Sequence, residues 1–157
     1  MRKILIGMAL SLAFAGTAMA SDYIVVNSTD PGIKRGTAFD AGSKVALGAG
    51  QTLTLMRASG EVTTLRGAAA GVTVPGAKLS SADAARFETL RALVQPPPEG
   101  RTFGARRGGL CPALESLTTL DDIVRVAETS GCKTVARQAL EAYLAKSGAP
   151  VAQTTQQ

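Results

Sequence analysis

Residues 44–66, with the sequence KVALGAGQTLTLMRASGEVTTLR, decide the fold of this chain because they read as two strands joined by a tight turn. A two-residue loop at Ser59-Gly60 would place leucines opposite Arg66 and Thr64, which are poor partners. A three-residue loop at 58–60 instead matches opposite charges, threonines and apolar side chains: Arg57 with Glu61, Met56 with Val62, Thr54 with Thr64, and Leu53 with Leu65. Such pairs each contribute roughly 0.2–1 kcal/mol, and Gly60 falls where this loop needs a left-handed residue. The sequence therefore predicts a hairpin with the three-residue loop.

The first 20 residues have the parts of a secretory signal peptide. Arg2 and Lys3 form a basic start, residues 4–16 are an apolar run, and residues 18–20 (AMA) are the small residues that signal peptidase reads. The apolar run is shorter than the roughly 20 residues that cross a bilayer. The sequence therefore predicts cleavage before Ser21, a periplasmic or secreted protein, and no transmembrane segment after cleavage.

Composition narrows the class of protein further. Removal of Arg2 and Lys3 lowers the formal net charge from +5 to +3, which is too small to indicate a nucleic-acid-binding protein. The chain has no Trp, two Tyr and four Phe, so its core must be built from Leu, Val and Ala. Such a core is thin, and an added covalent constraint would support it.

Cys111 and Cys132 are the two cysteines of the chain. In an exported protein a single pair of cysteines reads as one disulfide bond, and two buried free thiols are the alternative. A zinc site is not expected, because the chain has no His and two thiolates do not complete a tetrahedral site.

Residues 21–76 are expected to form a β-module. Besides the hairpin, β-branched runs at 22–27, 38–39, 44–47 and 72–74 are separated by Gly-rich turns. This spacing favours a small sandwich or barrel. Both faces of the hairpin carry apolar residues, with Leu53, Leu55 and Leu65 on one and Met56 and Val62 on the other. We therefore expect the second face to be covered, for instance by the helix that follows.

Residues 77–95 contain that helix. Apolar residues recur at helical spacing over 81–95, Ser80 or Ser81 can cap the N-terminus, and the prolines at 96–98 end it. Residues 96–110 are rich in Pro, Gly and Arg and are interpreted as a linker.

Residues 111–148 are expected to form a helical hairpin linked by the disulfide. Thr119 is the predicted cap of a helix over 120–129, Gly131 ends it, and a second helix covers 133–147. Arg137 and Glu141 are predicted to pair at i,i+4 on the second helix. Residues 149–157 are expected to be a disordered tail. The fold class is thus α+β.

Residues that could carry chemistry are few. The lack of His removes the usual general base and most catalytic metal sites. Asp121 and Asp122 are adjacent, which suits a helix start better than a shared substrate. Arg101, Arg106 and Arg107 form a basic cluster that could contact an anionic envelope partner, the alternative being a solvated linker. No enzyme activity, metal or cofactor is predicted.

Three stretches of the β-module, GTAFDAGSKVAL at 36–47, LTLM at 53–56 and SGEVTTL at 59–65, resemble a FecR-like periplasmic domain. The resemblance covers about residues 22–75 and implies a compact all-β unit with a binding role on the envelope side. The family's usual Thr-Gly dipeptide between the second and third strands is not found, and neither is the cytoplasmic anti-sigma segment of the full regulators.

The sequence therefore predicts a non-catalytic binding or structural accessory protein of the cell envelope, with an envelope protein or a glycan as its partner. Two other functions stay open. One is a soluble FecR-like sensory component that partners a membrane signalling protein. The other is an envelope hydrolase, which would need two converging carboxylates.

Overall fold

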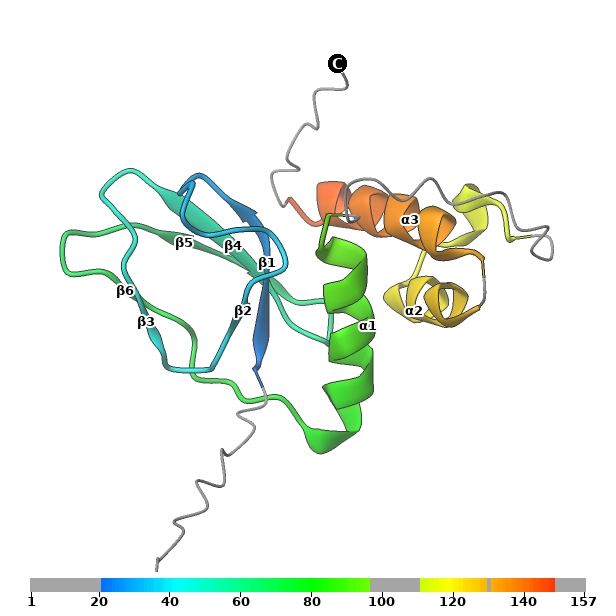
Figure 1. Cartoon of the computed structure of the whole chain (residues 1–157), viewed down its shortest axis with the longest axis horizontal. Helices are drawn as coiled ribbons and strands as arrows, with labels where there is room; N and C mark the ends of the chain where they lie inside the picture. Colours follow the sequence, from blue (N-terminus) through cyan, green and yellow to red (C-terminus); the bar gives the residue numbers. More distant parts are fainter. Residues whose placement is uncertain (1–20, 97–110, 130, 149–157) are drawn as a thin grey trace, which may run out of the picture.

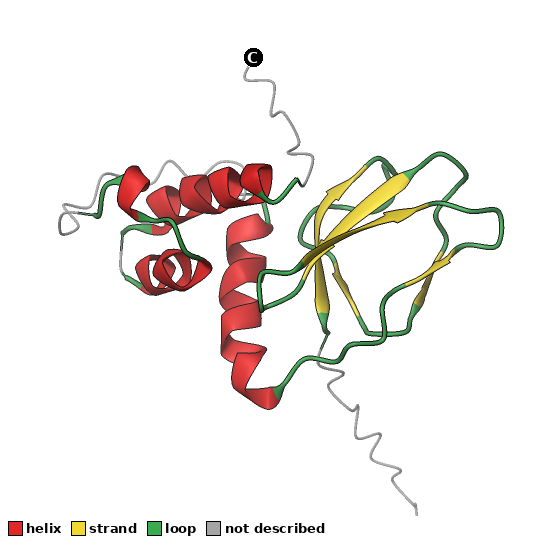
Figure 2. Ribbon diagram, turned by 180° about the vertical axis from the view of Figure 1, so that it is seen from behind, coloured by secondary structure: helices red, strands yellow, loops and turns green. Residues whose placement is uncertain are grey.

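A computed structural model gives the fold, and it describes residues 21–96, 111–129 and 131–148. The predicted signal peptide, most of the predicted linker and the predicted tail lie outside these residues. Strands come first and helices follow (Figures 1 and 2), which confirms the α+β class. The elements in chain order are β1 (Tyr23–Ser28), β2 (Ala38–Phe39), β3 (Lys44–Val45), β4 (Thr52–Met56), β5 (Val62–Arg66), β6 (Val72–Thr73), the 3₁₀ turn η1 (Ser81–Asp83), α1 (Ala84–Val94), the 3₁₀ turn η2 (Leu114–Ser116), α2 (Leu120–Glu128) and α3 (Lys133–Lys146).

The hairpin of β4 and β5 has the register predicted for the three-residue loop. Gly60 has a φ of +88°, and its N–H donates to the carbonyl oxygen of Arg57 over 3.0 Å. The Arg57 guanidinium and the Glu61 carboxylate are 3.1 Å apart. Opposite residues across the two strands are Leu53 and Leu65, Thr54 and Thr64, and Met56 and Val62. Near-neighbour chemistry was therefore enough to select this register.

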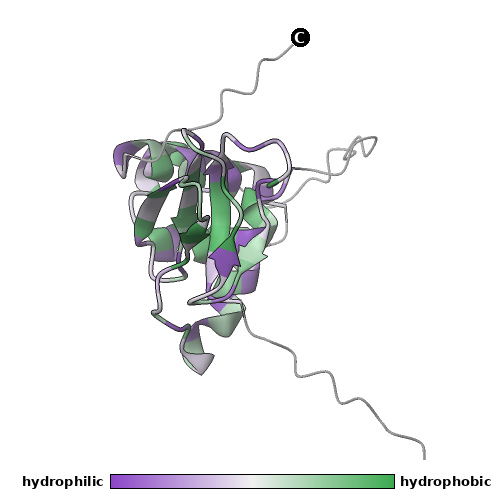
Figure 3. Cartoon of the chain, turned by 90° about the vertical axis from the view of Figure 1, so that its left-hand side faces the viewer, coloured by the Kyte–Doolittle hydropathy of each residue, from purple (hydrophilic) through white to green (hydrophobic). Residues whose placement is uncertain are grey.

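The strands form two sheets. The larger has the antiparallel order β2-β1-β4-β5, and the smaller pairs β3 with β6. Apolar side chains of both sheets pack into one buried cluster between them, so this part of the chain is a small sandwich. The cluster consists of Tyr23, Val25, Val45, Leu47, Leu53, Leu55 and Val74. Figure 3, which views the molecule from the strand end, shows apolar residues along the central strands.

The opposite face of the larger sheet is covered by helices, as the two-sided pattern of the hairpin predicts. Ile24, Val26 and Met56 from the sheet share a buried cluster with apolar residues of α1, α2 and α3. The helices α2 and α3 therefore join the same core as α1 and the sheet. Arg35, in the β1–β2 connection, forms an ion pair with Glu141 of α3 and so links the strands to the last helix.

The start of α1 differs from its prediction. Neither Ser80 nor Ser81 caps the helix with its hydroxyl, because η1 precedes α1 and its first backbone bond runs from Asp83 N–H to Ser80 O. The Ser80 hydroxyl instead donates to the Asp83 carboxylate. The prediction for the second helix is confirmed, since Thr119 accepts the N–H of Asp122 over 3.2 Å.

The predicted pair of Arg137 with Glu141 is also wrong. The Arg137 guanidinium reaches the end of α1, where it donates to Leu93 O over 3.0 Å and to Gln95 O over 3.3 Å. The last carbonyls of a helix lack partners within that helix and favour a positive charge. Arg137 is therefore a tertiary cap that ties α3 to α1, while Glu141 is left to pair with Arg35.

Candidate functional site

The predicted disulfide joins Cys111 to Cys132, with an S–S distance of 2.06 Å and a Cα–Cα distance of 5.6 Å. Cys132 lies at the N-cap of α3, and its side chain is buried in the core below the helices. The bond therefore holds the chain that enters η2 against the start of α3. This role is structural.

The predicted arginine cluster lies outside the described residues, because residues 101, 106 and 107 belong to the segment that the structure does not describe. Contact of Arg101, Arg106 and Arg107 with an anionic partner stays a prediction.

The two adjacent aspartates have separate partners. Asp121 pairs with Arg86 of α1, while Asp122 accepts hydrogen bonds from the Thr119 hydroxyl and from Arg125. They stabilise the start of α2 and its contact with α1, and they do not converge on a common point. In the described part of the chain no three His, Cys, Asp or Glu residues are grouped so that they could hold a metal ion.

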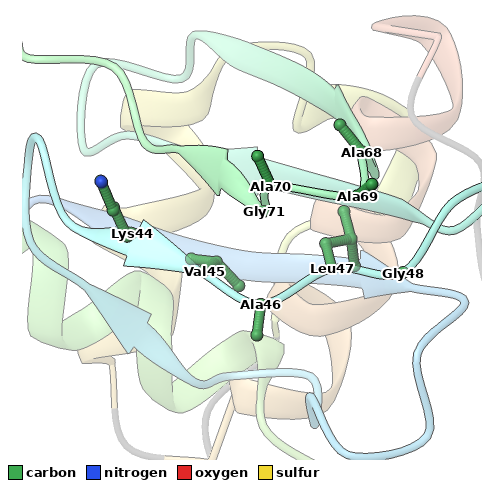
Figure 4. A pocket seen from close by; sticks show the side chains of 9 residues that line it. All are labelled: Lys44, Val45, Ala46, Leu47, Gly48, Ala68, Ala69, Ala70 and Gly71. Atoms are coloured by element: carbon green, nitrogen blue, oxygen red, sulfur yellow. The ribbon is translucent and has the colours of Figure 1, made fainter.

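An open groove of about 520 Å³ lies between two backbone segments of the strand region (Figure 4). One wall is β3 with the chain that continues it, and the other is the turn between β5 and β6. The lining residues are Lys44, Val45, Ala46, Leu47, Gly48, Ala68, Ala69, Ala70 and Gly71. Lys44 is the single member of this set with polar atoms in its side chain, so main-chain N–H and C=O groups supply most of the groove's polar character.

The groove is bounded where its two walls meet. At one end Lys44 and Val45 pair with the residues of β6. At the other end Gly67 lies so close to Gly48 that a Cβ at position 67 would be 1.8 Å from the Gly48 carbonyl oxygen. Only glycine permits this approach of the two backbones. The groove therefore lies between two places where its walls are in contact, the β3–β6 pairing and the approach of Gly67 to Gly48.

One edge of the larger sheet adjoins the groove. β5 is the last strand in the sheet order, so within the described residues β4 is its single hydrogen-bonded neighbour. β5 then leads through Gly67 into the Ala-rich wall of the groove. The other edge strand, β2, has only two residues.

The hydrogen-bond pattern shows which residues of β5 face outward. Bonds from Arg57 N–H to Glu61 O (3.0 Å) and from Gly67 N–H to Gln51 O (2.8 Å) mark two bonded pairs of the β4–β5 ladder. Bonded and non-bonded pairs alternate along an antiparallel ladder. Between these two bonded pairs, the alternation assigns the backbone hydrogen bonds with β4 to residues 63 and 65 of β5. The N–H and C=O groups of Val62, Thr64 and Arg66 therefore point away from β4.

A second, smaller hollow of about 150 Å³ lies beside α3. It is lined by η2 and the chain after it together with one face of α3, and Leu114 at its rim is the large apolar side chain that is exposed among the described residues. No cluster of reactive groups accompanies it.

Sequence reasoning missed both the groove and the open edge. In the sequence, the run GAAAG at 67–71 is one of the Gly-rich turns between the expected strands. The sequence feature that could have indicated the groove is a run without bulky side chains between two strands. Glycine in such a run permits another backbone to come close.

None of the helices in the described part of the chain has the length and apolar character that crossing a membrane requires. Comparisons with protein-family models, with curated proteins and with solved structures found no match to this chain.

Proposed function

We propose that this protein is a non-catalytic accessory protein of the cell envelope that binds an extended segment of another envelope protein in the groove of residues 44–48 and 68–71. The observation that carries the proposal is the make-up of this groove. Two backbone segments line it, and apart from Lys44 its side chains are small or aliphatic. Extended peptides are commonly recognised by such main-chain groups next to a strand.

The chemistry of the lining favours a polypeptide over a glycan. A sugar needs several polar side chains that match its hydroxyl groups, whereas this groove has one, the Lys44 ammonium. A peptide segment needs main-chain donors and acceptors, and the main-chain groups of Ala46, Leu47, Ala69 and Ala70 in the groove make no hydrogen bond to other described residues. The same lining offers no carboxylate or hydroxyl side chain for acid–base or nucleophilic chemistry, which supports binding as the role of this site.

Two features support a location outside the cytoplasm. The first 20 residues have the pattern of a signal peptide. The Cys111–Cys132 pair forms a disulfide, a bond that persists in oxidising compartments.

Site-specific photocrosslinking in living cells tests the proposal. A photoreactive phenylalanine analogue at Ala69, in the groove wall, should give a defined crosslinked product with an envelope protein, identified by mass spectrometry. The matched control carries the analogue at Ala85, which is exposed on α1 away from the groove. Absence of a product at Ala69, or the same product from both positions, would contradict binding in the groove.

A soluble sensory role remains the second candidate, supported by the FecR-like resemblance of residues 36–65. The same experiment separates the two roles, because a sensory component should crosslink to an integral membrane protein with a cytoplasmic signalling segment. A structural accessory should crosslink to a protein without one.

A further inference from the structure

We propose that two copies of this protein associate through β5, in an antiparallel arrangement about a two-fold axis at Thr64. The two four-stranded sheets would then form one continuous sheet. This interface adjoins the groove but uses none of its lining residues, and the proposal does not depend on the proposed function.

β5 is suited to pairing because its edge has little of the usual protection. Natural edge strands are kept from pairing by shortness, by Pro or charged side chains, especially Lys, or by a bulge, and of these β5 has only the charge of Arg66 at its end. β5 has five residues, VTTLR, without Pro or Lys, and its register with β4 runs without interruption. The opposite edge, β2, is protected by its length of two residues. One edge of the sheet is therefore closed to pairing and the other is open.

The outward-facing groups of β5 favour this arrangement, because an axis at Thr64 pairs all three of these residues, whereas an axis at Thr63 or Leu65 pairs only two of them. A two-fold axis at Thr64 places Thr64 opposite its equivalent in the other copy and places Val62 opposite Arg66. These are the residues whose N–H and C=O groups point away from β4, as the ladder alternation requires. Each of the three resulting pairs can exchange two backbone hydrogen bonds, about six in all.

The side chains are compatible with an axis at Thr64 and disfavour an axis at either end of the strand. Thr64 meets Thr64, a pairing that β4 and β5 already use between Thr54 and Thr64. The stem of Arg66 meets the half-buried Val62, so no like charges face each other. A two-fold axis at Arg66 would oppose two guanidinium groups, and one at Val62 would run into the loop at 58–60 after one further pair.

The register points to a second copy as the occupant. β5 can pair with a second β5 because, about an axis at Thr64, its one charged residue, Arg66, lies opposite Val62 and no like charges face each other. Two of the three residues whose backbone groups face outward, Thr64 and Arg66, have exposed polar side chains. A polar edge stays soluble when free, so the pairing should be reversible and should depend on protein concentration.

Sedimentation equilibrium of the purified chain from Ser21 onward, with its disulfide intact, tests the proposal. We expect a monomer–dimer equilibrium. Thr64→Pro should abolish the dimer, because Pro removes the outward N–H while no bond to β4 uses that group. Thr64→Lys should raise the dissociation constant at least about tenfold, since two ammonium groups would meet at the axis.

The control is Thr134→Lys, which makes the same change at an exposed site on α3 and should leave the equilibrium unchanged. Circular dichroism verifies that each variant is folded, and Thr64→Lys keeps the test decisive if Thr64→Pro does not fold. A wild-type monomer up to about 0.5 mM would overturn the proposal. So would a dimer that Thr64→Lys does not weaken.

Discussion

The two faces of the four-stranded sheet are buried in different ways. Among the described residues, the helix-covered face belongs to a cluster of 18 buried side chains, and the face toward β3 and β6 belongs to a cluster of seven. The helix face also has the disulfide and the Arg137 cap. The face toward β3 and β6 has the open groove. Buried packing is therefore concentrated on one face, and the groove lies on the other.

The two faces are nevertheless coupled through the central strands. Ile24 and Val25 are neighbours on β1, yet they point into different clusters because successive residues of a strand alternate between its faces. Leu55 and Met56 do the same on β4. Loss of either cluster removes packing from the same two strands, so we expect both faces to unfold in one transition.

The largest effect is expected from Leu140→Ala in the helix-covered cluster. Leu140 is fully buried on α3, and such truncations cost about 2–5 kcal/mol through lost burial and the cavity left behind. Urea unfolding followed by circular dichroism measures the loss. Leu55→Ala, also fully buried but in the smaller cluster, is the counterpart. Each variant should shift one common transition, and two separate transitions would show that the faces are independent.

The double variant Cys111→Ser and Cys132→Ser should lose roughly 3 kcal/mol, the chain-entropy contribution of a loop that joins residues 21 apart. From the sequence we expect the helical part to melt first while the β-module persists. The shared core predicts instead that helix and strand signals fall together on heating. Two reactive thiols in denatured, unreduced wild-type protein would contradict the disulfide itself.

Gly60→Ala tests whether the hairpin loop is held against α3. A Cβ at this position would meet Tyr143 Oη at 2.8 Å and Leu120 Cδ2 at 2.9 Å, besides requiring a φ of +88°. The expected loss is about 1–3 kcal/mol. Gly50→Ala is the matched control, because its φ is +82° and nothing lies within 4 Å of the new Cβ. Equal losses in the two variants would mean that the loop does not pack on the helices.

The smallest effect is expected from Arg137→Met. This change keeps most of the side-chain volume but removes the hydrogen bonds to Leu93 O and Gln95 O, at a cost of about 1–1.5 kcal/mol. Arg125→Met is the control, because Arg125 is mostly exposed and its ion pair among the described residues is with Asp122 on its own helix. A surface pair of this kind contributes little. Equal stabilities of the two variants would remove Arg137 as a link between α3 and α1.

The sequence by itself determined the features that depend on neighbours along the chain. The β4–β5 register follows from cross-strand partners a few residues apart, and Gly60 follows from the dihedral angles of a three-residue loop. The Thr119 cap depends on residues within one helical turn, and Gly131, with a φ of +95°, on the turn that ends α2. Such short-range requirements can be read from spacing, because the chain itself holds the partners close together.

Only the tertiary structure decided which distant groups meet. Arg137 and Glu141 are suitably spaced to pair with each other, yet each pairs elsewhere. Arg137 donates to carbonyl oxygens at the end of α1, and Glu141 forms an ion pair with Arg35. The groove and the open edge of β5 likewise depend on where the two sheets and the turn at 67–71 come to lie. The physical reason is that the spacing within one element fixes its own faces, while the partner of each face is chosen by the packing of the whole chain.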